Sequence, residues 1–249
     1  MVRAMIFVAL FAIEAMAQTP LIFYCGITMV PATLEAKKNF ERTHHCTIQI
    51  VQGGSKDLYK SIDATHKGDL FLPGKISYVD QCDHKGNVLY KRLVGYNRLA
   101  LFTQKNNPKH IRSLRDLLRK DLLITLGNPD TCSIGKAAEA TLIRYGGEHY
   151  LKQVQNNLGL YAADSRDMNH LLAKRQVDAG LNWVASAQTH EAHNAVTIVP
   201  LSDPYAQPEA LVISVLRFSA HTQLAKAFVD YLASPEGRAI MQRHGFSHE

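Results

Sequence analysis

The sequence lacks the long apolar runs, charge blocks and metal-ligand spacings that mark several protein classes. After the first twenty residues, no run reaches the about 18 apolar residues that a membrane-spanning helix needs. The 28 Lys and Arg exceed the 22 Asp and Glu by six, without any long basic run. No helix-turn-helix, zinc-finger or RNA-binding aromatic motif is present, so nucleic-acid binding is not expected. A mildly basic surface instead favours small anionic ligands.

The overall composition is that of a folded globular protein. Apolar residues make up 46% of the 249 residues and charged residues 20%. This length suits one large domain or two of ordinary size, and it allows a core that needs no disulfides. The composition excludes a disordered tail, a collagen-like fibre and a polytopic membrane protein.

Residues 1–17 have the pattern of a secretory signal peptide. Met1-Val2-Arg3 is a short basic region, residues 4–13 are apolar, and Ala15-Met16-Ala17 matches a cleavage site. We expect cleavage after Ala17 and export of the mature protein, to the periplasm if the cell has two membranes. No lipobox cysteine follows the site, so a lipid anchor is not expected. The alternative is a buried N-terminal helix.

Export affects the interpretation of the four cysteines, Cys25, Cys46, Cys82 and Cys132. In an oxidising compartment an even number permits two disulfides, with three pairings. None of the spacings is CxxC, so the cysteines do not indicate a zinc site.

Strands and helices alternate along the chain. Short apolar runs predict strands at 21–24, 47–51, 69–72, 98–103, 122–126, 179–183, 196–200 and 210–216. Amphipathic patterns predict helices at 32–43, 55–62, 75–82, 114–118, 133–145, 166–176, 221–232 and after Pro235. Ser55 and Ser133 are well placed as N-caps, and Gly146 is expected to end its helix. This alternation predicts an α/β architecture with largely parallel sheets.

Three loops that follow strands carry glycine and hydroxyl residues. They are Cys25 to Thr28, Gly53-Gly54-Ser55 and Gly127 to Gly135. Free backbone N–H groups at a helix start, with a hydroxyl beside them, form an uncharged cradle for an anion. The alternative is that Thr28, Ser55 and Ser133 act only as helix N-caps.

Signals for an enzyme are weaker. The GxSxG motif of serine hydrolases is absent. Cys25 or Cys132 could pair with one of twelve histidines in an exported thiol enzyme, but so many histidines make such a pairing easy to find. No metal and no cofactor are expected.

Seven short motifs are distributed along nearly the whole mature chain: Tyr24–Met29, Gly53–Ser55, Gly68–Phe71, Leu101–Pro108, Gly127–Gly135, Val177–Trp183 and Phe228–Gly237. In order and spacing they resemble the periplasmic solute-binding proteins of ABC importers, in the molybdate/tungstate-binding branch of the two-lobed class II fold. The resemblance implies a hinged α/β protein that is not an enzyme. Each lobe would have a mixed, mostly parallel sheet flanked by helices.

The resemblance also implies a domain division and a binding site. Lobe I would comprise residues 18–100 plus 200–249, and lobe II residues 101–199. A small anionic ligand would be gripped between them by neutral N–H and O–H donors. The implied ligand-binding residues are Cys25, Gly26, Thr28, Gly54, Ser55, Thr131, Cys132, Ser133 and Trp183. The implied partner is an importer permease, and the protein would be a monomer.

The sequence departs from the family pattern at ligand-facing places. Cys25 replaces a small apolar residue, Cys132 and Ser133 occupy a loop that usually carries Val-Pro, and Trp183 stands where the family commonly has tyrosine. A molybdate-like oxyanion is the first candidate ligand; a carboxylate, a phosphorylated compound or a thiol peptide remains an alternative. If Cys25 and Cys132 face each other across the cleft, at least one is predicted to be a free thiol that shapes the site. The alternative places all four cysteines in disulfides.

Overall fold

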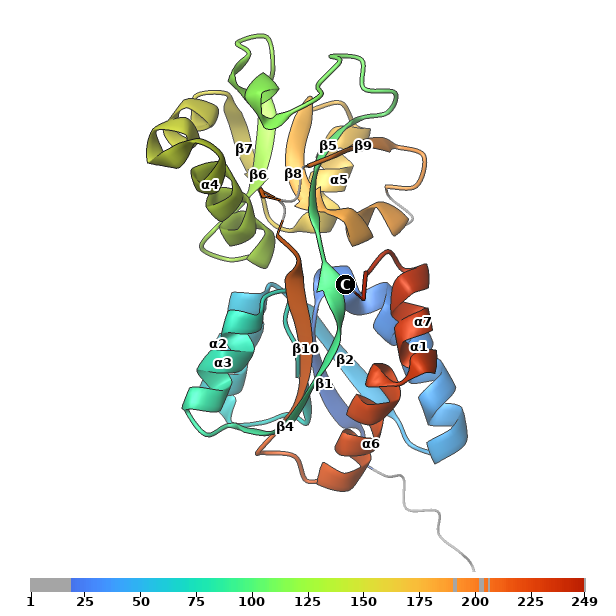
Figure 1. Cartoon of the computed structure of the whole chain (residues 1–249). Helices are drawn as coiled ribbons and strands as arrows, with labels where there is room; N and C mark the ends of the chain where they lie inside the picture. The colour runs from blue at the N-terminus through green and yellow to red at the C-terminus, as the bar shows by residue number, and fades with distance from the viewer. Residues whose placement is uncertain (1–18, 190–191, 202–203, 206, 249) are drawn as a thin grey trace, which may run out of the picture.

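The computed structural model describes residues 19–189, 192–201, 204–205 and 207–248 (Figure 1). They form two lobes stacked end to end, each with one five-stranded sheet that carries helices on both faces. Within these ranges, no helix is long and apolar enough to cross a membrane. The predicted signal peptide, residues 1–17, lies outside the described residues.

The sheet of lobe I has the strand order β2-β1-β3-β10-β4. Strand β1 is parallel to β2 and β3, whereas β10 is antiparallel to both of its neighbours. The strands are β1 Leu21–Gly26, β2 Ile48–Gly53, β3 Leu70–Leu72, β4 Val88–Asn97 and β10 Glu209–Leu216. The helices are η1 Ile27–Met29, α1 Val30–His44, α2 Ser55–Thr65, α3 Ile76–His84, α6 Thr222–Ala233 and α7 Pro235–Arg243.

Alternation along β1 divides the core of lobe I into two layers. Phe23 and Cys25 pack with α1, α6 and α7, whereas Tyr24 packs with α2 and α3. The Phe23 ring meets Phe228 of α6 edge-on, with 5.7 Å between ring centroids. Successive side chains of a strand point to opposite faces, so each apolar residue of β1 contributes to one of the two layers.

The sheet of lobe II has the strand order β7-β6-β8-β5-β9, in which β5 is antiparallel to both neighbours. Its strands are β5 Leu99–Gln104, β6 Ile124–Gly127, β7 Leu158–Ala162, β8 Ala179–Trp183 and β9 Val196–Pro200. Its helices are η2 Leu114–Leu118, α4 Ser133–Gln155, α5 Ser165–Ala173 and η3 Val184–Gln188. Leu101 and Leu142 share the layer under α4, and Phe102 and Met168 share the layer under α5.

The chain passes between the two sheets twice. It leaves lobe I between Asn97 of β4 and Leu99 of β5, and it returns between Pro200 of β9 and Glu209 of β10. Because β10 lies between β3 and β4, the C-terminal segment is built into the centre of the first sheet. Each sheet thus has four strands in one direction and one strand in the other, as the mixed, mostly parallel architecture predicts.

Several local predictions were wrong. Ser55 and Ser133 are not N-caps: Gly54 and Cys132 occupy the cap positions, and each serine is the first helical residue. The segment at 114–118 is a 3-10 helix. The prediction that Gly146 ends its helix is confirmed, because Gly146 and Gly147 (φ +76) have non-helical dihedral angles and a second helical segment of α4 follows to Gln155. Strands β4 and β7 were not predicted at all.

Candidate ligand-binding site

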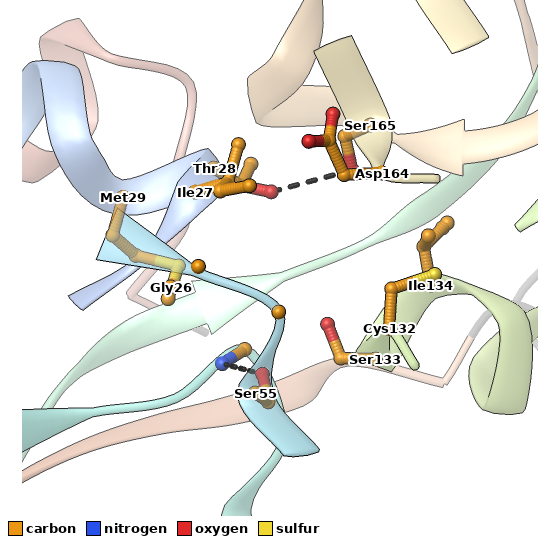
Figure 2. Close-up of a pocket in the computed structure, with 13 residues that line it drawn as sticks. Gly26, Ile27, Thr28, Met29, Ser55, Cys132, Ser133, Ile134, Asp164 and Ser165 are labelled. Carbon is orange, nitrogen blue, oxygen red and sulfur yellow. Dashed lines mark hydrogen bonds between the residues drawn. The ribbon is translucent and has the colours of Figure 1, made fainter. Parts of the chain in front are cut away.

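A cavity of about 20 Å³ lies between the two lobes (Figure 2). Lobe I contributes the ends of β1 and β2, the residues of η1, the first residue of α2 and Gly74. Lobe II contributes the starts of α4 and α5. The lining residues are Gly26, Ile27, Thr28, Met29, Gly53, Gly54, Ser55, Gly74, Cys132, Ser133, Ile134, Asp164 and Ser165.

The parallel pairing of β1 and β2 brings the two lobe I loops together. Gly26 lies beside Gly53 at the last register position of this strand pair. The carboxyl ends of parallel strands meet at one edge of a sheet, and the helices that follow begin there. The loop that leads into η1 and the loop that leads into α2 are therefore neighbours at the cavity.

Helix α2 places Ser55 at the cavity wall. Leu58 and Ile62, at a helical spacing of four, anchor this helix in the apolar layer of lobe I. The backbone N–H of Gly74 donates to Ser55 Oγ at 3.0 Å, and Ser55 is only 2% exposed. Because its oxygen already accepts a hydrogen bond, the hydroxyl proton of Ser55 is available to donate to a ligand.

Helix α4 presents Ser133 from lobe II. Ile134 and Ala138 anchor its first turns in apolar clusters. The Cys132 thiol donates to the backbone carbonyl of Asn128 at 3.2 Å and turns the loop back onto the helix. Burial, and then the negative charge of Asp164, raise the pKa of Cys132, so the group at the cavity is a neutral thiol.

Helix α5 presents Ser165 from the same lobe. The Asp164 carboxylate caps the helix by accepting hydrogen bonds from the backbone N–H groups of Arg166 and Asp167. Asn182, which is fully buried in β8, donates to the Ser165 carbonyl at 3.0 Å and to Asn169 Oδ1 at 2.9 Å. This network fixes the start of α5 from behind.

The donors that face the cavity are electrically neutral. Three helices begin there with serine, Ser55, Ser133 and Ser165, and the backbone N–H groups of these three serines have no acceptor among the described residues. A helix N-terminus carries about half a positive charge. None of the thirteen lining residues is Lys, Arg or His. Asp164 is the one charged residue of this lining, and its carboxylate accepts hydrogen bonds from the N–H groups of Arg166 and Asp167 in α5. The starts of α2 and α4 therefore attract an anion through dipoles and hydrogen bonds.

The two lobes also contact each other around the cavity. The Thr28 hydroxyl of lobe I donates to Ser165 Oγ of lobe II at 3.4 Å, as Figure 2 shows. Lys56 of α2 and Asp130 of lobe II are 3.9 Å apart. The Lys136 ammonium of α4 lies 5.3 Å from the ring centre of Tyr78 in α3. Contacts between the lobes thus flank the cavity.

The sequence profile of one family, the bacterial extracellular solute-binding proteins, matches residues 21–247. The chain belongs to this family. Its members are binding proteins, so this solute-binding protein is not an enzyme, and the alternative of a thiol enzyme is excluded. The family name places its members outside the cytoplasm.

Individual relatives are distant. The chain is 26% identical to the putative ABC transporter substrate-binding lipoprotein YvgL of Bacillus subtilis, over 86% of this chain and 81% of that one. It is 24% identical to the molybdate-binding protein ModA of Mycobacterium tuberculosis, over 84% and 72%. Its fold is similar to that of the sulfate-binding protein SubI from the same species, with a TM-score of 0.82, 17% identity and coverage of 92% and 86%.

Most of the residues predicted to bind the ligand line the cavity of the solute-binding protein. They are Gly26, Thr28, Gly54, Ser55, Cys132 and Ser133. Thr131 lies beside it, with its carbonyl close to Gly54. Cys25 and Trp183 are not brought to the cavity.

The structure gives Cys25 and Trp183 core positions. Cys25 is fully buried in lobe I, its sulfur lies 3.4 Å from Thr33 Oγ1, and burial raises its pKa to about 12. It does not face Cys132 across the cleft, because the alternation of β1 directs its side chain into the core. Trp183 is 1% exposed and packs with Leu99 and Cys132. All four cysteines are free thiols.

Sequence reasoning did not identify Ser165, Asp164 or Gly74 as lining residues. The signal for Ser165 was present, because Asp164 is a favoured N-cap residue directly before it. Strand β7 was not predicted, so the start of α5 was not recognised as lying beyond a strand end. Among the described residues, no group of three or more His, Cys, Asp or Glu is placed to hold a metal ion.

Proposed function

We propose that this solute-binding protein traps a small tetrahedral oxyanion between its lobes and delivers it to an ABC importer. Molybdate or tungstate is the first candidate. The observation that carries the proposal is the convergence of three serine-initiated helices on one cavity without a cationic side chain. Such a site stabilises an anion by neutral donors at helix N-termini.

The size of the cavity supports a compact ligand. Its volume of about 20 Å³ is little more than one water molecule requires, so only a compact ligand fits without a change in the separation of the lobes. A sugar phosphate or a peptide requires a wider separation of the lobes.

The relatives support the same ligand class. One relative is named for molybdate and a protein of similar fold is named for sulfate, and both ions are tetrahedral oxyanions. A third is named as a substrate-binding component of an ABC transporter, which supports a membrane permease as the partner. Export through a signal peptide cleaved after Ala17, to the periplasm in a cell with two membranes, is part of this proposal.

Calorimetric titration of the chain from Gln18 onward tests the ligand class. The panel contains molybdate, tungstate, sulfate, phosphate, a small carboxylate and glutathione. We expect saturable binding of one ligand per chain for an oxyanion. At a thousandfold excess over its dissociation constant, this ligand should add about 4 kcal/mol to the free energy of unfolding. Binding of only the carboxylate or glutathione would contradict the oxyanion proposal, and so would silence across the panel.

A matched pair of variants tests the site. Ser55→Ala removes a hydroxyl that faces the cavity, and Ser61→Ala removes one from the same helix away from it. A hydrogen bond to a charged ligand contributes about 1.5–3 kcal/mol, so Ser55→Ala should weaken binding by roughly 10- to 100-fold. Ser61→Ala should leave the affinity unchanged. Equal effects of the two substitutions would refute the assignment of the site.

A further inference from the structure

We infer that the contact between Gly54 of lobe I and the Thr131 carbonyl of lobe II is a steric stop that sets the size of the ligand. The inference rests on the proposed function, because it concerns which oxyanion the same cavity selects. Gly54 and Thr131 were predicted to bind the ligand directly. The geometry gives them a different role, which is to define how far the lobes close.

The first observation is the space at Gly54. A Cβ atom added to Gly54 would lie 2.6 Å from the backbone oxygen of Thr131, a separation that real Cβ atoms essentially never show. Gly54 has φ -63 and ψ 142, which any residue adopts, so its backbone conformation does not require glycine. The close approach of the other lobe is what excludes a side chain.

The second observation is that the stop cannot yield easily. The Thr131 oxygen belongs to a loop whose backbone is held at both sides, since the N–H groups of Thr131 and Cys132 donate to the Asn128 carbonyl at 3.3 and 3.0 Å. On the other side, the backbone N–H of Leu58 donates to the Gly54 carbonyl at 3.0 Å. Two hydrogen-bonded backbone segments therefore meet without a flexible side chain between them.

The third observation is the position of the stop beside the cavity. Gly54 directly precedes Ser55, and Thr131 directly precedes Cys132 and Ser133. Ser55, Cys132 and Ser133 line the cavity. An increase in the separation of the two segments moves the opposing donors Ser55 and Ser133 apart. The Lys56 ammonium and the Asp130 carboxylate lie 3.9 Å apart at the same corner. The Gly54–Thr131 contact limits how closely the two lobes approach there.

A second interlobe contact is softer. A Cβ atom on Gly74 would lie 2.6 Å from Ser133 Oγ, but this hydroxyl can rotate. At Gly53 an added Cβ would lie 3.2 Å from the end of the Leu58 side chain, within lobe I. The three glycines therefore form a graded series: a rigid contact between lobes, a yielding contact between lobes and a contact within one lobe.

Gly54→Ala tests the inference through ion selectivity. The added Cβ would lie 2.6 Å from the Thr131 oxygen, and an ordinary contact between these atoms begins at 3.4 Å. The lobes must therefore separate by about 0.8 Å at this corner, and close-packed interfaces respond to changes of this size. Sulfate is smaller than molybdate. We expect the ratio of the sulfate to the molybdate dissociation constant, measured by calorimetry, to rise by about tenfold, the lower end of what one methylene-sized difference costs in a fitted site.

The control variants separate this effect from damage to the fold. Ser61→Ala, on α2 away from the cavity, should leave the ratio unchanged, and Gly74→Ala should give a smaller change than Gly54→Ala. The thermal midpoint of ligand-free Gly54→Ala, in buffer without oxyanions, should equal that of the wild type, since the contact joins two separately packed lobes. An unchanged ratio in Gly54→Ala would overturn the inference while wild-type binding upholds the proposed function. If the wild type binds no oxyanion, the proposed function itself fails.

Discussion

Replacing Asn182 by leucine should severely destabilise lobe II. Asn182 is 0% exposed and makes three hydrogen bonds: it donates to the Ser165 carbonyl and to Asn169 Oδ1, and it accepts from the Trp183 N–H at 2.9 Å. Leucine has nearly the same shape but no polar atoms. The substitution leaves buried partners unsatisfied, at about 1–3 kcal/mol each. For the three partners the combined cost is about 3–9 kcal/mol.

That cost is large compared with the total stability of a typical domain, about 5–15 kcal/mol. Urea unfolding followed by far-UV circular dichroism measures it directly. Asn156→Leu is the matched control, because Asn156 is exposed at the end of α4 in the same lobe. The control should change stability by no more than about 0.5 kcal/mol. A loss below about 1 kcal/mol for Asn182→Leu would refute the reasoning that these hydrogen bonds are essential.

Three further predictions concern single groups. Burial raises the pKa of Glu209, so the stability that its protonated form contributes is present at low pH and is lost as the pH rises above 4.5. Glu209→Gln should therefore reduce the fall in the free energy of unfolding, measured with urea, between pH 4.5 and 7. An unchanged pH profile would contradict this. Cys46 should be the most reactive thiol of the folded protein towards an aromatic disulfide reagent, because the other three cysteines are buried. Rapid reaction of all four thiols before the protein unfolds would contradict the packing. Trp183 should emit as a buried indole and resist quenching by acrylamide, and emission typical of a solvated indole would place it elsewhere.

Local sequence patterns identified most of the elements. The strands β5, β8, β9 and β10 were confirmed, because each is a short run dominated by apolar residues. Strand β4 was missed because it is an edge strand whose Lys91 and Arg92 are exposed and interrupt the apolar pattern. Strand β7 is also an edge strand, and it exposes Leu160 and Tyr161. Edge strands need less burial, so their sequences carry a weaker signal.

Local sequence patterns also identified part of the candidate site. Ser55 and Ser133 follow visible strand and loop signals, and both line the cavity. Their expected role as N-caps was wrong by one position, since serine is favoured both at the cap and at the start of a helix and the pattern alone does not separate the two. Ser165 was missed because the strand that leads to it was missed.

The sequence by itself determined the α/β alternation and the hydroxyl-bearing helix starts, because both depend on local patterns. The order of its motifs carried the family resemblance that implied two lobes. Only the tertiary structure decided which helix starts meet. It directed Cys25 and Trp183 into the cores, because the phase of each strand and the packing above it set the direction of a side chain. It also brought the Thr131 carbonyl against Gly54, a contact between segments 77 residues apart that no local pattern encodes. Contacts between lobes depend on how two finished cores fit together, and that fit defines the size of the cavity.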